Sequence, residues 1–148
     1  MRASKPMNLT QALYTFLAED ADLTALLATY QDAPAIFTTD PAPGDAALPY
    51  IVSAGEVTQV PMDTKTTRGR DLRRDVRCYA AATGSAVLVE QIAERVRALL
   101  HRQPIVIAGF NWLVSDITGP IVADERETQS GRDTYGRVLT LSLKAQEA

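Results

Sequence analysis

Several residue types on which disulfide, metal or membrane chemistry depends are scarce in this sequence. The chain has one cysteine and one histidine, which excludes an internal disulfide and a zinc site built from several cysteines. No apolar stretch approaches the roughly 18–20 residues that a membrane-spanning helix needs. The first six residues are basic but lack an apolar run, so we expect no signal peptide there.

The overall amino-acid composition is that of an ordinary globular domain. The 148 residues contain 46% hydrophobic and 22% charged side chains, with eight glycines and eight prolines. This length supports one hydrophobic core. We expect a flexible N-terminal tail over residues 1–7 and a single domain over residues 8–145. The lone cysteine agrees with synthesis in a reducing compartment.

The spacing of apolar residues predicts helices in two parts of the chain. Asn8 is placed to cap a first helix whose apolar stripe runs from Leu9 to Leu17, and Asp22 is placed to cap a short second helix. The strongest pattern covers residues 86–102, where an amphipathic helix is expected to stop before Pro104. The expected core-facing stripe of this helix is Leu88, Ile92, Val96 and Leu99, with Val89, Ala93 and Leu100 beside it.

Alternating apolar and polar residues predict strands over much of the remaining chain. The segment 71–80 is expected to place Leu72, Arg74, Val76, Cys78 and Ala80 on one face, and Arg73, Asp75, Arg77 and Tyr79 on the other. Further strands are expected at residues 35–38, 48–54, 56–60, 105–107, 112–117 and 135–144, and loops at residues 31–47, 62–70 and 124–133. This order predicts an α+β fold, an antiparallel-dominated β-sheet with helices packed on one side.

Charge is distributed unevenly along the chain. Residues 1–64 hold two basic and eight acidic side chains, a net charge of −6, whereas residues 65–148 hold 13 basic and 10 acidic ones, a net charge of +3. Such a split is typical of self-associating proteins, and it is equally compatible with two solvated faces. The formal net charge of −3 and the pI of about 5.1 argue against a dedicated nucleic-acid-binding protein.

Four arginines, Arg68, Arg70, Arg73 and Arg77, are the candidate interaction residues. Alternation with period two places Arg73 and Arg77 on the polar face of the 71–80 strand, with Arg68 and Arg70 just upstream in a loop. Three interpretations are open. The face is solvated with cross-strand ion pairs, or it forms a subunit interface with the acidic N-terminal half of a neighbouring copy, or it contacts nucleic acid.

Candidate catalytic and metal-binding residues are few and isolated. His101, the only histidine, lies at the end of the predicted 86–102 helix, where a cation suits the helix dipole. Cys78 alternates with apolar residues and is expected to be a small buried side chain rather than a nucleophile. The acidic run 124–127 contains no histidine, and Gly84 alone does not make a phosphate-binding loop. We therefore expect no enzymatic activity, no cofactor and no metal.

The order of the elements and several short motifs resemble one known family. The sheet opens with Leu48-Pro49-Tyr50-Ile51-Val52 and continues after a polar loop with Val76-Arg77-Cys78-Tyr79-Ala80. The main helix carries Ile92-Ala93-Glu94, and the last strand carries Tyr135-Gly136-Arg137. Over residues 8–145 this set resembles the tail-completion, or tail-terminator, proteins of long-tailed bacteriophages, prophages and gene transfer agents.

The resemblance implies a structural virion protein that has no catalytic residues. It implies a homohexameric ring, made in the bacterial host cytoplasm, which sits at the head-proximal end of the tail tube, ends tube polymerisation and joins tail to head. The implied partners are the tail tube protein and a head-side neck or connector protein, with DNA passing through the lumen without sequence-specific binding and with no membrane contact.

Two questions stay open within this resemblance. In such a ring we expect Arg73 and Arg77 at the subunit interface rather than in the lumen, because a lumen that held phosphates tightly would hinder DNA ejection. The alternatives to a tail terminator are another neck or head-closure ring component and, in a different class, a small ligand-binding or enzymatic α+β domain.

Overall fold

Helices and strands follow one another in the predicted order, and the fold is α+β. A computed structural model describes residues 6–39, 42–53, 55–126 and 133–148. The helices are α1 (Leu9–Ala18), α2 (Ala21–Thr24) and α3 (Val87–Leu100). The strands are β1 (Thr29–Tyr30), β2 (Ala33–Pro34), β3 (Ile36–Phe37), β4 (Tyr50–Val52), β5 (Glu56–Pro61), β6 (Gly69–Ala81), β7 (Phe110–Val122), β8 (Glu125–Arg126) and β9 (Asp133–Glu147).

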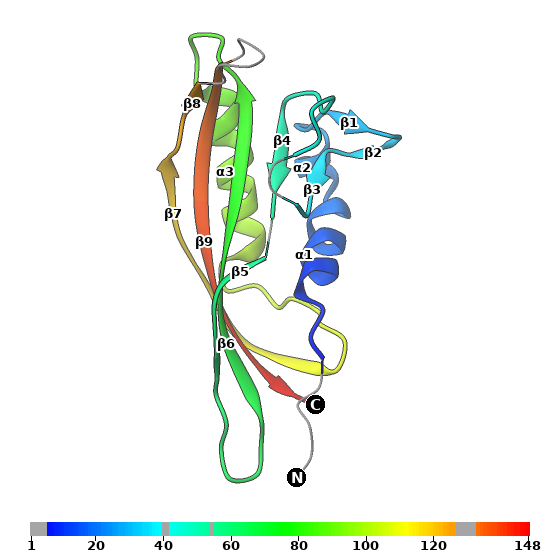
Figure 1. The fold of residues 1–148 in the computed structure, drawn as a ribbon, viewed down its shortest axis with the longest axis vertical. Coiled ribbons are helices and arrows are strands. Elements are labelled where there is room, and N and C mark those ends of the chain that lie inside the picture. Colours follow the sequence, from blue (N-terminus) through cyan, green and yellow to red (C-terminus); the bar gives the residue numbers. More distant parts are fainter. Residues whose placement is uncertain (1–5, 40–41, 54, 127–132) are drawn as a thin grey trace.

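The main sheet is built around three long strands. Its order is β3-β4-β6-β9-β7, with β5 also paired to β6 and β8 to β9, and every pair is antiparallel except β3 with β4. The small β1–β2 hairpin forms a separate two-stranded sheet. Figure 1 shows α3 lying along β6, β7 and β9, with α1 and α2 beside it near β3 and β4. The antiparallel-dominated sheet is therefore confirmed.

Each N-terminal helix begins at a side-chain cap. The Asn8 carboxamide oxygen accepts a hydrogen bond of 3.0 Å from the Gln11 amide, so the predicted cap of α1 is confirmed. The prediction that Asp22 caps the second helix is wrong. The cap is Asp20, whose carboxylate accepts from the Leu23 amide at 2.8 Å, because α2 begins two residues earlier than the apolar pattern suggested.

Helix α3 presents a slightly different face from the predicted one. Its buried residues are Val89, Ile92, Ala93, Val96 and Leu100. Leu88 is exposed and Leu99 is only half-buried. The buried stripe therefore keeps Ile92 and Val96 at its centre but includes Val89 in place of Leu88. The helix also ends at Leu100 rather than at Arg102, because Arg102 adopts a φ of 55°, outside the helical range.

Several strand boundaries differ from the sequence-based prediction. The expected loop 62–70 is shorter, because β6 already begins at Gly69 and pairs with the end of β9. Residues 105–107 are not a strand. Ile105 and Ile107 are buried, but the only ladder contact there is one bridge between Ile107 and Phe110. A run of three apolar residues thus supplies two buried side chains without a hydrogen-bonded partner strand.

The last two long strands continue further than predicted. Gly119 and Pro120 were expected to end this strand, but β7 continues past them. The two residues lie in a bulge, where the register with β9 shifts between Thr118 and Ile121. In the expected loop 124–133, β8 pairs with the start of β9, and residues 127–132 lie outside the described residues. The expected tail over residues 1–7 also lies largely outside them.

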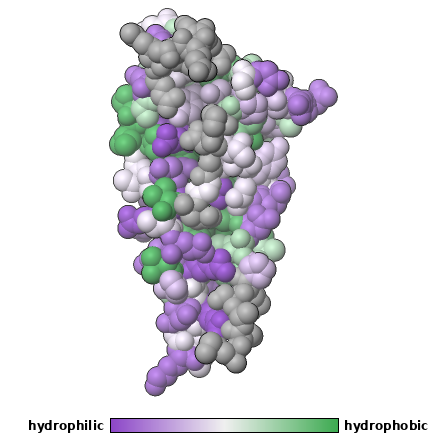
Figure 2. Space-filling view, in the orientation of Figure 1, coloured by the Kyte–Doolittle hydropathy of each residue, from purple (hydrophilic) through white to green (hydrophobic). Residues whose placement is uncertain are grey.

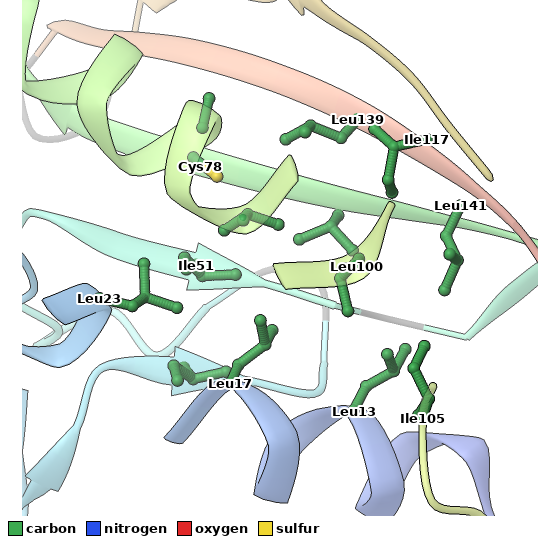
Figure 3. Close-up of a cluster of buried hydrophobic side chains, with 14 of the residues drawn as sticks. Leu13, Leu17, Leu23, Ile51, Cys78, Leu100, Ile105, Ile117, Leu139 and Leu141 are labelled. Atoms are coloured by element: carbon green, nitrogen blue, oxygen red, sulfur yellow. The ribbon is translucent and has the colours of Figure 1, made fainter. Parts of the chain in front are cut away.

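The hydrophobic core fills the space between the sheet and the helices. Figure 3 shows Leu13 of α1 beside Ile105 and Leu17 of α1 toward Ile51 and Leu23, with Leu100 between α1 and the β9 residues Leu139 and Leu141. All of these side chains are buried, as are Cys78 and Val76 on the inner face of β6. The predicted division of β6 into a core face and an outer face is therefore correct.

Candidate subunit interface

The outer face of the sheet carries the first pair of candidate arginines. Arg73 is exposed and Arg77 is half-buried, while the intervening Val76 is fully buried on the other face. Between the two arginines, Asp75 accepts a hydrogen bond of 3.0 Å from the Thr140 hydroxyl of β9. The side chains thus alternate as predicted, and this part of the outer face is polar.

Above this polar region, an aromatic row covers the same face. Tyr30, Phe37, Tyr50 and Tyr79 contact one another in sequence, with ring centroids 5.2, 5.6 and 5.5 Å apart. Their tilted and edge-on geometry is the favourable one for aromatic pairs. The row joins the β1–β2 hairpin to β3, β4 and β6. The sequence pattern does not reveal this row, because its members come from four separate strands.

The other two candidate arginines do not share this face. Arg70 lies within β6, not in a loop, and its guanidinium carbon sits 5.4 Å from the centroid of the Phe110 ring. Arg68 precedes β6, and its backbone carbonyl accepts from the Glu147 amide at 2.7 Å. The arginine run is thus divided between an outer-face pair and a pair at the lower end of β6.

The β5–β6 hairpin ends in an ordered turn rather than an irregular loop. The Thr67 amide donates to the Thr64 hydroxyl at 3.0 Å, and the Thr64 amide donates to the Thr67 carbonyl at 2.8 Å. The Gly69 amide donates to the Asp63 carboxylate at 3.2 Å. In Figure 1 this turn forms the lower tip of the molecule. Figure 2 shows that the lower end of this face is mostly hydrophilic, whereas hydrophobic patches higher up are small and separated.

Arg74, on the core face of β6, is a buried charged residue that links neighbouring elements by hydrogen bonds. Its side chain is 0% exposed. Its guanidinium donates to the Ser53 carbonyl at 2.7 Å, to the Ser53 hydroxyl at 3.1 Å and to the Thr10 hydroxyl at 3.0 Å. It therefore links α1 to the end of β4. The sequence pattern placed Arg74 on the core face, but nothing in that pattern indicated these partners.

A second arginine joins the helices to one another. Arg95 of α3 makes two hydrogen bonds to the Asp20 carboxylate, at 2.9 and 2.7 Å. The hydrogen bonds from Arg95, and then that from the Leu23 amide, outweigh desolvation and lower the pKa of Asp20 below 3.8. Asp20 thus caps α2 and binds α3 with the same carboxylate.

The candidate catalytic residues have structural roles. The His101 Nδ1 atom accepts a hydrogen bond of 3.0 Å from the Ile117 amide, which fixes the end of α3 against β7. Cys78 is buried, and burial raises the pKa of its thiol to about 12, so the reactive thiolate is disfavoured. Asp124 accepts from the Gly136 amide and pairs with Arg137 at 3.3 Å.

Among the described residues, no cluster of three or more histidine, cysteine or acidic side chains could hold a metal ion. No helix in the described part of the chain is long and apolar enough to cross a membrane. The described surface offers features that can contact other proteins: charged strand faces, exposed apolar side chains and a projecting hairpin. These features define a small α+β protein with a polar outer strand face and a projecting hairpin.

Comparison with known proteins identifies the family. The model of the family "Tail completion protein gp17" matches residues 11–142, so the chain belongs to this family. The fold is similar to that of a chain in the structure "Virion of native gene transfer agent (GTA) particle", with a TM-score of 0.67 and 20% identity over 92% of this chain and 94% of that chain. No curated protein matches the sequence significantly. The protein is therefore a structural component of a virion or gene transfer agent tail, and the predicted family is confirmed.

Proposed function

We propose that this protein forms a homohexameric ring at the head-proximal end of the tail tube, where it ends tube polymerisation and joins the tail to the head. The observation that carries the proposal is the family match over residues 11–142, supported by a fold shared with a virion protein. The partners are the tail tube protein on one side of the ring and a head-side neck or connector protein on the other.

The charge distribution supports a ring built from one repeated contact. A ring requires a heterologous interface, in which two different patches of the same chain meet. The net charges of −6 on residues 1–64 and +3 on residues 65–148 are of opposite sign, as the two sides of such a contact require. DNA passes through the lumen without sequence-specific binding, in agreement with a formal net charge of −3.

Within this ring we assign Arg73 and Arg77 to the subunit interface. The outer polar face of β6 carries both side chains, with Arg73 exposed and Arg77 half-buried, and the acidic N-terminal half of a neighbouring copy offers the opposite charge. Replacing both arginines with glutamate puts like charges together, which costs several kcal/mol and should abolish the ring. Intact rings from this double variant, seen by native mass spectrometry or in particles, would refute the assignment. Intact rings with altered DNA ejection would place the two arginines in the lumen.

Deleting the gene tests the function directly. Without a terminator, tubes continue to polymerise, so electron micrographs of lysates should show overlong tails that carry no heads. Complementation with the full chain should restore both length and joining. Tails of normal length that merely fail to join heads would instead identify a neck or head-closure component, and unchanged particles would refute a tail role altogether.

A further inference from the structure

Strand β5 lies at an edge of the main sheet, where its only partner strand is β6 (Figure 1). The Met62 amide donates to the Gly69 carbonyl at 2.9 Å, which sets the alternation of hydrogen-bonded and non-hydrogen-bonded pairs along the β5–β6 ladder. Counted back from this pair, the N–H and C=O of Val60 face β6, whereas those of Gln59 point away from it. No residue in the described part of the chain bonds these two outward groups of Gln59.

This edge lacks most of the protection that exposed strands carry. Edge strands are commonly shielded by charged side chains, bulges or prolines. Residues 57–61 have no charged side chain and all are exposed, with Val57 at 61% and Val60 at 55%. The bulge between Glu56 and Thr58 and the proline Pro61 lie at the two ends of the strand, so its middle stays open. An open edge of this kind is suited to accept an additional strand.

The two faces of the sheet next to β5 differ in chemistry. On the outer face Val60 lies opposite Asp71, which in turn lies opposite Lys144 of β9, so the side of Val60 away from β6 is apolar and uncharged. On the inner face Gln59 and Pro61 border a pocket of ≈ 340 Å³. The rest of its lining is polar or backbone: Asp63, Arg68, Gly69, Arg70 and Glu147. An added strand should therefore alternate apolar side chains outside with polar ones inside.

A second copy of this chain is a poor source of that strand. Among the described strands, β1, β2, β3 and β8 have only two residues each. The outward groups of β7 are already bonded at its middle, where Arg102 donates to Ser115 and His101 accepts from Ile117, and two register shifts interrupt the rest. Pairing β5 with β5 of another copy would place the two chains about a two-fold axis and stop at a dimer, whereas a ring requires a heterologous contact.

We propose that the β5 edge binds an extended segment of a different protein of the particle, which joins the sheet as an additional strand. The segment pairs with the N–H and C=O of Gln59 and donates to the C=O of Pro61, which the same alternation turns outward. Its apolar side chains lie beside Val60, and its polar ones enter the pocket beside Gln59. This inference rests on the proposed ring, because the ring is what excludes two-fold pairing of β5.

A proline tests the backbone of this edge without removing a hydrogen bond of the β5–β6 ladder. Gln59→Pro removes only the outward N–H, and edge strands accept proline where the N–H faces solvent. The matched control, Gln59→Ala, shortens the same side chain and keeps that N–H. Both full-length variants should melt like the native chain. In particles, Gln59→Pro should lower the yield of joined heads and tails about tenfold, and Gln59→Ala should leave it unchanged. Equal yields from the two variants, whether high or low, would overturn the proposal.

Photocrosslinking identifies the occupant and does not depend on the proline variant. Particles lacking the native protein are complemented with the full-length Val60→p-benzoylphenylalanine variant and irradiated, and the adducts are sequenced by mass spectrometry. The expected adduct joins this position to a segment of a different protein in which apolar and polar residues alternate. A dimer of this chain, an adduct to a segment without that alternation, or no adduct would overturn the proposal.

A label on β7 is the matched control for the crosslink. Ile121 is 63% exposed and lies outside the proposed contact, so the Ile121→p-benzoylphenylalanine variant should not give the adduct seen at position 60. The same adduct from both positions would also overturn the proposal. The tail lengths of the deletion strain test the proposed function separately. A dimer adduct together with overlong tails would therefore refute only the β5 inference.

Discussion

The carboxylate of Asp20 stabilises two helices at once, so its removal should weaken both the start of α2 and the attachment of α3. Asp20 caps α2 through the Leu23 amide and binds Arg95 of α3 through two hydrogen bonds. In Asp20→Ala both interactions disappear. In Asp20→Asn the cap is kept, because asparagine is as good a cap as aspartate, and only the charged pair is lost.

The magnitudes follow from the two contributions. Losing a side-chain cap costs about 1 kcal/mol. The pair is bidentate but Arg95 is 35% exposed, so solvent screening limits its contribution to about 1 kcal/mol. We expect Asp20→Ala to lower the free energy of unfolding by about 2 kcal/mol and the Tm by about 4–8 °C, and Asp20→Asn to cause about half of each change.

The pH dependence separates the pair from the cap. Because Arg95 lowers the pKa of Asp20 below 3.8, the pair stabilises the fold above that pH, and its contribution is lost as pH falls through the folded-state pKa. In thermal melts, the difference in Tm between the native chain and Asp20→Asn should be constant from pH 7 down to about pH 4. It should narrow as the pH falls further toward pH 3. A double-mutant cycle with Arg95→Met isolates the coupling. Equal melting temperatures at pH 7, or a gap that does not change with pH, would refute this account.

Three further substitutions or labels probe the core and the strand contacts. Ile92→Ala should lower the free energy of unfolding by about 2–5 kcal/mol in urea titrations, because Ile92 is completely buried at the centre of the α3 stripe. Gly136→Ala should destabilise by about 1–3 kcal/mol in the same assay, because a Cβ there would overlap the backbone carbonyl of Ala123. Cys78 should resist Ellman's reagent at pH 8 in the folded chain and react fully in denaturant, because its thiol is buried with a pKa of about 12.

Matched positions serve as controls for these measurements. Leu88→Ala changes an exposed position of the same helix and should shift the unfolding free energy by no more than about 0.5 kcal/mol. Gly44→Ala adds a Cβ with no atom within 4 Å and should be equally silent. Large effects at these two positions, or small ones at Ile92 and Gly136, would show that the packing differs from the one described.

Local pattern predicted the parts of this fold that depend on local physics. Period-two alternation assigned the two faces of β6 correctly, because a long central strand turns one face to the core; the other face is polar as far as Arg77 and covered by the aromatic row at Tyr79. The Asn8 cap and the burial of Ile92 follow equally from neighbours in sequence. The family itself was predicted from the order of such elements and their motifs and is confirmed.

The features that escaped prediction depend on contacts between distant segments. The carboxylate of Asp20, which caps α2, also binds Arg95, 75 residues away, and the sequence pattern did not indicate this partner. Arg74 finds its partners 21 and 64 residues away, at Ser53 and Thr10. Composition and periodicity carry no signal for such pairs, which require the tertiary fold before they exist.

The two outer strands near the lower end of the sheet differ in a way that bears on assembly. The edge of β7 is closed by the end of α3: the Arg102 amide donates to the Ser115 carbonyl at 2.7 Å, and His101 accepts from the Ile117 amide. The β7 bulges blunt this edge further. No comparable cover lies over the described side chains of β5, whose Val57 and Val60 face solvent. A chain that protects one edge and leaves the other open favours contact in one direction only. At β5 that contact is with a strand of a different protein, because two copies joined through this edge would stop at a dimer. A directional contact between copies closes a ring where its rotation permits, as the proposed function requires, and the outer face of β6, which carries the exposed Arg73, remains available for it.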